Sequence, residues 1–425
     1  MILTTFLGAL LGAMAIGIPI AFALLISGTA LMWQLDMFDP QILAQNLING
    51  ANSFPLLAVP FFMLAGEIMT VGGLSRRIVD FALALVGHVK GGLGYVTIIT
   101  ACVMAALSGS AVADAAAMTA LLLPMMTAAG HDRRRSAGLI ASAGIIAPVI
   151  PPSIGLIIFG VAANVSISKL FLAGIFPGLM MGTALWMTWA YVVRKEDVKP
   201  LPRKNRQDIL RAARESIWAL GMPVIIVVGL RFGVFTPTEA AVVAAVYALF
   251  VSTVIYREMT LSSLYQVFFN SAKVSAIIML LVAAAMVSAW LITVAGLPDM
   301  VIDLLEPLID QPFLLMLVTM ALIVLVGTSM DMTPTILILT PILMPAIKAA
   351  GIDPVYFGVM FIINTAIGLI TPPVGTVLNT VAGVGRLSMD DTVRGAFPFL
   401  LAQLAILALL ILFPDLVLVP AKWLY

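Results

Sequence analysis

Residues 107–126 read LSGSAVADAAAMTALLLPMM and lie inside an apolar stretch, 91–128, that Ser108-Gly109-Ser110 interrupts near its centre. Each half of the stretch has about 17 residues, slightly short for a helix that crosses a bilayer core of about 30 Å. Polar backbone at membrane depth is stable only where protein or a wet cavity surrounds it. The pattern predicts a helical hairpin that enters the membrane and turns back.

A second apolar stretch, 312–349, has the same form and is interrupted by Gly327-Thr328-Ser329-Met330-Asp331. An ungapped offset of 221 residues relates the surroundings of the two hairpins. It pairs Ser108 with Ser329, Thr119 with Thr340, Pro124 with Pro345, Gly130 with Gly351, Pro151-Pro152 with Pro372-Pro373, and Gly174, Phe176 and Pro177 with Gly395, Phe397 and Pro398. Matching helix breakers at one offset indicate an internal repeat.

Two longer apolar stretches contain prolines in their middle. Stretch 136–163 includes Pro151, Pro152 and Ser153, and stretch 354–384 includes Thr371-Pro372-Pro373. Proline removes a backbone donor and clashes with the preceding turn, so both helices are predicted to unwind within the membrane. Hairpins and broken helices in paired positions are typical of transporter binding sites. The expected organisation is one membrane domain, with repeat 1 at about 1–193, a cytoplasmic loop at 194–215 and repeat 2 at about 237–419.

The composition supports a membrane protein. Of 425 residues, 62% are hydrophobic and 10% charged, and the mean hydropathy is +1.14. Soluble domains are about half apolar and a quarter charged, which excludes a cytosolic enzyme or a DNA-binding module. The net charge of +1 implies no nucleic-acid partner, and the single cysteine, Cys102, excludes a disulfide framework.

The distribution of charge predicts the orientation. If hairpin 91–128 opens to the cytoplasm and hairpin 312–349 to the other side, then 18 of the 22 Lys and Arg residues lie on the cytoplasmic side. This agrees with the positive-inside rule. The two repeats are therefore expected to be inverted, with the N-terminus in the cytoplasm and the C-terminus in the periplasm.

The tips and breaks supply the candidate site. Unwound carbonyls and hydroxyls suit a hard cation, and half-helix N-termini suit an anionic substrate. The predicted Na⁺ ligands are Ser108, Gly109, Ser110, Gly327, Thr328, Ser329, Thr371, Gly375 and Thr376. The predicted substrate contacts are Pro152, Ser153, Asp331 and Asn379, and the predicted helix breaks are Pro151, Pro152, Pro372 and Pro373. The alternative is that Gly and Pro only shape kinks in a static bundle.

Four acidic residues fall within or beside apolar stretches: Glu67, Asp114, Glu239 and Asp331. A carboxylate inside a membrane is costly and is a functional candidate by default. Asp331 adjoins a hairpin tip and is interpreted as a site residue. Asp114 either contributes to the site or braces its hairpin, and Glu67 and Glu239 are interpreted as structural.

Four long runs carry a family resemblance. They are NSFPLLAVPFFMLAGEIM (52–69), the run 107–126 quoted above, PPSIGLIIFGVAANVSISKLFLAGIFPGLMMG (151–182), and MDMTPTILILTPILMPAIKAAGIDP (330–354) with FGVMFIINTAIGLITPPVG (357–375). The chain resembles the large membrane subunit of tripartite ATP-independent periplasmic (TRAP) transporters. ALFVSTVIYREMT and FGVMFIIN are most similar to the 2,3-diketo-L-gulonate branch. Two departures are Gly155, where many relatives have proline, and Thr328-Ser329, where relatives have apolar residues.

The resemblance implies an all-α polytopic protein of the bacterial inner membrane, an inverted-repeat elevator-type transporter with two re-entrant hairpins and two broken helices. It implies Na⁺ as the coupling ion, no other cofactor, and no enzymatic activity. It also implies two protein partners, a small membrane subunit of the Q type and a periplasmic binding protein of the P type. The expected substrate is a small carboxylate or keto-sugar acid. Alternatives are a proton-coupled carrier, a channel, or a membrane-embedded enzyme, for which the sequence offers no acid–base constellation.

Overall fold

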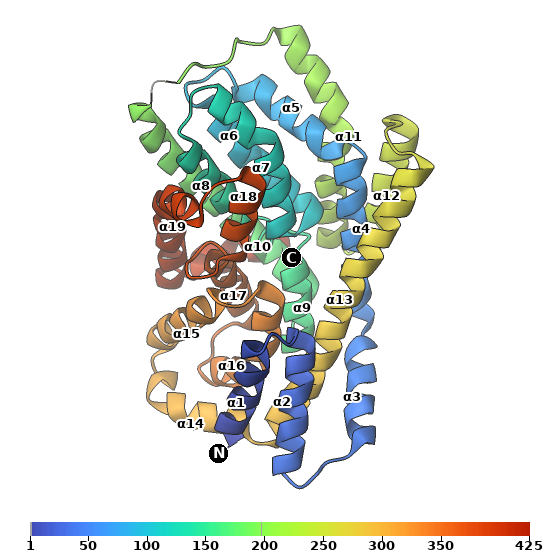
Figure 1. Ribbon diagram of the computed structural model, residues 1–425, viewed down its shortest axis with the longest axis vertical. Coiled ribbons are helices and arrows are strands. Elements are labelled where there is room, and N and C mark those ends of the chain that lie inside the picture. Colours follow the sequence, from blue (N-terminus) through green and yellow to red (C-terminus); the bar gives the residue numbers. More distant parts are fainter. Residues whose placement is uncertain (1, 197) are drawn as a thin grey trace.

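The computed structural model describes residues 2–196 and 198–425, and over these ranges the chain is helical with no β-strand (Figure 1). Among the described residues, eight helices are long and apolar enough to cross a membrane. Several shorter apolar helices lie between them. The all-α class that the family resemblance implies is therefore observed.

The N-terminal stretch 2–33 forms two short helices instead of one span. α1 (Ile2–Ala15) ends before Gly17, whose φ is +84°, and Pro19 precedes α2 (Ile20–Gln34). The two helices pack against each other, so the chain turns back toward the end of the molecule where it began. In Figure 1 the N-terminus lies near α14 (Leu297–Ile309) and far from α5 (Leu74–Val86). This differs from the expectation that the N-terminus shares a side with Arg76 and Arg77, because a glycine–proline turn splits the apolar stretch.

One side of the molecule holds steep helices that frame the rest (Figure 1). They are α3 (Pro40–Ala51), α4 (Ala58–Val71), α11 (Arg206–Arg231), α12 (Pro237–Phe250) and the long α13 (Leu261–Val294). α11 begins at a capping box, in which Asn205 and Asp208 satisfy each other's backbone N–H groups. The predicted loop 194–215 is therefore shorter than expected, because this cap starts the helix ten residues earlier than the apolar pattern does.

The remaining helices form two sets in the same order. The first set is α5, α6 (Gly92–Ser108), α7 (Ala111–Ala128), α8 (Arg133–Gly144), α9 (Ile154–Ala163) and α10 (Ile167–Val192). The second set is α14, α15 (Pro312–Gly327), α16 (Met332–Ala349), α17 (Pro354–Gly368), α18 (Thr376–Gly385) and α19 (Met389–Leu412), followed by α20 (Asp415–Leu424).

The helix bounds follow the offsets of the sequence repeat. α5 and α14 coincide at an offset of 223 residues, and α7 and α16 coincide at 221. The turns between paired helices differ in length. Two residues, Gly109 and Ser110, join α6 to α7, whereas four residues, 328–331, join α15 to α16. We call these turns tip 1 and tip 2.

Small residues let the two sets approach each other. A Cβ added to Gly138 of α8 would lie 2.0 Å from the carbonyl carbon of Gly395 in α19, far inside van der Waals contact. The guanidinium of Arg133 also donates to the carbonyl of Gly385 at the end of α18, over 2.7 Å. These contacts join the first broken helix to α18 and α19 of the second set.

Candidate functional site

The first break separates α8 from α9 at Pro151-Pro152, a cis peptide, and it is fully buried. Ser153 is the N-cap of α9: its hydroxyl accepts from the backbone N–H of Leu156 over 3.1 Å and donates to the carbonyl of Pro148. A serine hydroxyl used in both directions stabilises the new helix start. The hydroxyl of Ser153, a predicted substrate contact, therefore makes both of its hydrogen bonds with the nearby backbone.

Tip 1 lies directly on this break. Gly109 has a φ of +63°, and a Cβ on it would lie 2.7 Å from the carbonyl oxygen of Pro152. Only glycine combines that backbone conformation with so close an approach. Ser110 caps α7 by accepting from the N–H of Ala113 over 3.4 Å. The tip and the break thus form one packed unit.

Tip 2 and the second break meet in a similar way. The carbonyl of Thr328 accepts from the backbone N–H of Val374 over 3.3 Å, and Gly327 packs on Gly368 at the end of α17. The second cis peptide, Pro372-Pro373, lies in this break. In contrast to the first break, residues 372–374 are exposed.

A cavity of about 310 Å³ lies between the two tips. Its polar wall consists of the starts of three helices, α7 at Ala111, α9 at Ile154 and α16 at Met332. The first N–H groups of a helix have no partner within it, and they carry the positive end of the helix dipole. Three such ends make the cavity suited to an anionic group.

The opposite wall of this central cavity is apolar. It is formed by Met63 of α4 and by Val274, Ile277 and Ile278 of α13. Asp331, the N-cap position of α16, is the one carboxylate among the described lining residues. A cavity with a few polar groups on one wall and apolar side chains on the other is the usual form of a small-molecule site.

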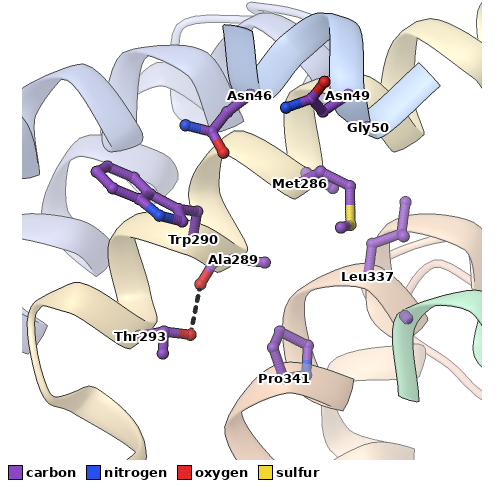
Figure 2. A pocket seen from close by; sticks show the side chains of 11 residues that line it. Asn46, Asn49, Gly50, Met286, Ala289, Trp290, Thr293, Leu337 and Pro341 are labelled. Carbon is purple, nitrogen blue, oxygen red and sulfur yellow. Dashed lines mark hydrogen bonds between the residues drawn. The ribbon is translucent and has the colours of Figure 1, made fainter. Parts of the chain in front are cut away.

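A second cavity, of about 360 Å³, lies farther along the same helices (Figure 2). It is bordered by α3, α13 and α16, and Figure 2 shows Asn46 and Asn49 on one side of it, with Trp290 near Asn46 and Pro341 on the far side. The hydroxyl of Thr293 donates to the carbonyl of Ala289 over 2.9 Å. Because both cavities border α13 and α16, they lie along one interface between the framing helices and the second hairpin.

The family model of the DctM component of the tripartite ATP-independent periplasmic transporters matches residues 7–416. The match covers nearly the whole chain. The chain belongs to this family. The resemblance predicted from the sequence is thereby confirmed, and the DctM component is a transporter permease subunit, not an enzyme.

Known relatives agree with this assignment. The chain is 60% identical to the 2,3-diketo-L-gulonate TRAP transporter large permease protein YiaN of Escherichia coli, over 98% of both chains. It is 38% identical to the sialic acid TRAP transporter large permease protein SiaM of Vibrio cholerae, over 95% of both chains. It is 37% identical to the C4-dicarboxylate TRAP transporter large permease protein DctM of Pseudomonas aeruginosa, over 91% of this chain and 92% of the relative.

A solved structure shares the fold. The YdaH transporter of Alcanivorax borkumensis superposes with a TM-score of 0.62 at 13% identity, over 87% of this chain and 86% of that one. Membership of the DctM family and the apolar helices together make the chain a multi-pass protein of the inner membrane. A DctM component works in a tripartite system with a small membrane subunit and a periplasmic binding protein.

The structure of this DctM component brings some predicted residues together and separates others. Gly109, Ser110 and Asp331 line the central cavity. Thr371 donates to the carbonyl of Ile367 over 2.8 Å, and Asn379 donates to the carbonyl of Val374 over 2.8 Å, so both brace the second break. Gly375 is buried and Ser329 is exposed, and neither lines this cavity.

The structure also shows the contacts of two of the acidic residues in the apolar stretches. Asp114 accepts from the hydroxyl of Ser108 across tip 1 over 2.6 Å, which is the brace considered as one alternative. Glu239 forms a capping box with Thr236 at the exposed start of α12, a structural role as interpreted. The lining residues of α4 and α13 were not predicted, because an apolar side chain that faces a cavity cannot be told from one that faces lipid.

Proposed function

We propose that this DctM component is the permease of a Na⁺-coupled TRAP system for a small organic acid, with 2,3-diketo-L-gulonate as the preferred substrate. The observation that carries the proposal is the convergence of three helix N-termini on the central cavity. Their free N–H groups would bind the substrate carboxylate without a basic side chain. The substrate itself is chosen from the name of the relative that is 60% identical.

The cavity also suits the rest of such a substrate. A volume of about 310 Å³ is at the lower end of the range for small-ligand sites. The carboxylate of Asp331 lies among its lining residues and can accept hydrogen bonds from the hydroxyls of a sugar acid. Met63 and Ile278 would cover the carbon chain and exclude water.

The oxygen atoms around the breaks support the proposed coupling to Na⁺. Thr376, at the start of α18, has a buried hydroxyl oxygen with no hydrogen-bond partner among the described residues. A buried oxygen without a partner is costly unless something binds it. Sodium prefers such hydroxyl and carbonyl oxygens, and the predicted ligands Thr328, Gly375 and Thr376 lie together at the second break. The carbonyl of Thr328 is already used by Val374, which leaves side chains and other carbonyls for the ion.

We further propose that the helix sets containing tips and breaks are inverted repeats that move as one body. The framing helices α4, α12 and α13 would form the stationary part. The first break is buried beneath tip 1, whereas residues 372–374 of the second break are exposed, so the two symmetry-related sites differ in access. Such a difference is expected of one state of an alternating-access carrier. By the positive-inside rule, the end with Arg133 to Arg135 faces the cytoplasm.

Sodium coupling is tested by uptake of 2,3-diketo-L-gulonate into proteoliposomes that contain the complete tripartite system. Replacing Na⁺ by choline is expected to reduce initial uptake by about 30-fold, which corresponds to about 2 kcal/mol, the middle of the usual range of coupling free energies. Collapse of a pH gradient at constant Na⁺ should have little effect. Uptake that is insensitive to choline and abolished by an added protonophore would instead support the proton-coupled alternative.

The partner proteins give a second expectation. We expect the two membrane subunits without the periplasmic binding protein to lose most of their uptake at substrate concentrations below saturation. The reason is that, in a tripartite system of this family, the periplasmic binding protein would capture the substrate and deliver it to the permease. Adding the purified binding protein to the same vesicles should restore the rate. An equal rate with and without it would contradict the tripartite assignment of this permease.

A further inference from the structure

A third pocket lies between tip 1 and α4. It measures about 100 Å³ and is lined by Met63, Glu67 and Thr70 of α4 and by Ser110 and Asp114 of the first hairpin, among others. Its lining therefore comes from two parts of the molecule, one framing helix and one hairpin. Neither carboxylate in it takes part in the substrate site described above.

The carboxyl group of Asp114 is only half satisfied. The residue is 2% exposed; its Oδ1 accepts from the hydroxyl of Ser108 over 2.6 Å, and its buried Oδ2 has no hydrogen-bond partner among the described residues. A buried carboxylate oxygen without a donor or a cation is strongly disfavoured. This oxygen therefore calls for an occupant that the protein chain does not provide.

Glu67 supplies a second carboxylate to the same pocket. It is half-buried, and no described Lys, Arg or His forms an ion pair with it. Two like charges that share a small pocket repel each other unless a cation or a proton lies between them. The other polar side chains in the lining are the hydroxyls of Ser108, Ser110 and Thr70, so oxygen atoms outnumber the single thioether sulfur of Met63.

We propose that this pocket is an additional Na⁺ site, formed by Glu67 and Asp114 and separate from the sites at the two tips and breaks. A pocket of this size with two carboxylates and several hydroxyls suits a small hard cation, and one thioether alone is a poor site for a soft one. Bound Na⁺ would offset one of the two negative charges, reduce the repulsion between the carboxylates and hold the first hairpin against α4. Because the ligands come from both parts, the ion binds in this arrangement and leaves when the hairpin moves from α4.

This inference rests on the proposed Na⁺ coupling and is tested by equilibrium binding of ²²Na⁺ to the purified complex of the two membrane subunits. We expect Glu67→Gln and Asp114→Asn each to bind one fewer Na⁺ per permease chain than the wild type. Both changes keep the shape of the side chain, and Asp114→Asn keeps an acceptor for Ser108. Glu306→Gln, at an exposed position on α14, is the matched control and should bind the wild-type number.

Each outcome decides the matter. A wild-type complex that binds no Na⁺ overturns the proposed coupling and this site with it. Normal binding by the wild type and an unchanged number in both variants overturns this site alone. An unchanged number together with an altered pH dependence of uptake means that Glu67 and Asp114, the titratable groups among the described lining residues, share a proton, and it overturns the metal site. If Asp114→Asn fails to assemble, Glu67→Gln decides, since the Glu67 side chain has no ion pair among the described residues to lose.

Discussion

Replacing Gly109 with alanine reduces uptake by about 100-fold and leaves the amount of permease in the membrane close to that of the wild type. The new Cβ would lie 2.7 Å from the carbonyl oxygen of Pro152, and the φ of +63° disfavours any residue with a Cβ. The left-handed conformation costs roughly 1–2 kcal/mol and overpacking roughly 1–3 kcal/mol. A total of about 3 kcal/mol in the closed tip corresponds to about 100-fold in rate. Initial uptake rates, normalised to membrane level, measure the effect.

The control for this change is Gly296→Ala. Gly296 has a φ of +69°, but a Cβ there meets no described atom within 4 Å. It therefore shares the conformational cost of Gly109 and lacks the contact with a break. We expect Gly296→Ala to retain most of the wild-type rate. Equal losses in both variants would show that backbone strain alone, and no contact between tip and break, explains the result.

Gly368→Leu is expected to reduce uptake to a similar extent through the second site. A Cβ at Gly368 would lie 2.8 Å from the carbonyl carbon of Gly327, so a leucine must push tip 2 away from α17. The displacement would break the bond from Val374 to the carbonyl of Thr328, which is 3.3 Å long. Overpacking of about 3 kcal/mol again corresponds to about 100-fold in rate.

The dependence on Na⁺ separates a damaged site from a damaged fold. Gly368→Leu should raise the Na⁺ concentration needed for half-maximal uptake, because the displaced tip carries proposed cation ligands. Gly383→Leu is the matched control, since Gly383 lies in α18 and a Cβ added there would meet no described atom within 4 Å. A loss of rate in Gly368→Leu with an unaltered Na⁺ dependence would contradict a role of tip 2 in ion binding.

Much of the fold was predictable because glycine and proline mark their own positions. The interruption at Ser108-Gly109-Ser110 falls where α6 ends and α7 begins, and Pro151-Pro152 falls between α8 and α9. These residues act locally, through backbone conformation and missing donors, so the sequence alone reveals them. The offset of 221 residues then predicted the corresponding hairpin and helix break in the second half of the chain.

The errors arose where local signals were outweighed by caps and turns. The apolar residues 2–33 carry only a weak boundary signal, Gly17 and Pro19, yet these two residues divide α1 from α2. The polar residues 206–215 looked like a loop, because the apolar periodicity starts later than the cap at Asn205. In both cases hydropathy located the apolar segment but did not give the residues at which the helices begin and end.

The site was less predictable than the fold. Ser153 was expected to contact substrate, and the structure shows that its hydroxyl caps α9, a second role to which a serine at a helix start is equally suited. The contact with substrate stays a prediction. The pairing of Glu67 with Asp114 joins positions 47 residues apart in sequence on different helices, and no spacing rule connects them. Contacts between separate helices depend on how the helices pack, and they cannot be inferred from a single sequence.

The unequal tips have a consequence for the balance between transport states. If the two proposed repeats were identical, exchanging their conformations would produce two states of equal free energy. Tip 1 turns in two residues and tip 2 in four, so the two exchanged states would differ in free energy. In a carrier built from such repeats, this difference in turn length would give the empty permease a preferred side before any ion or substrate binds.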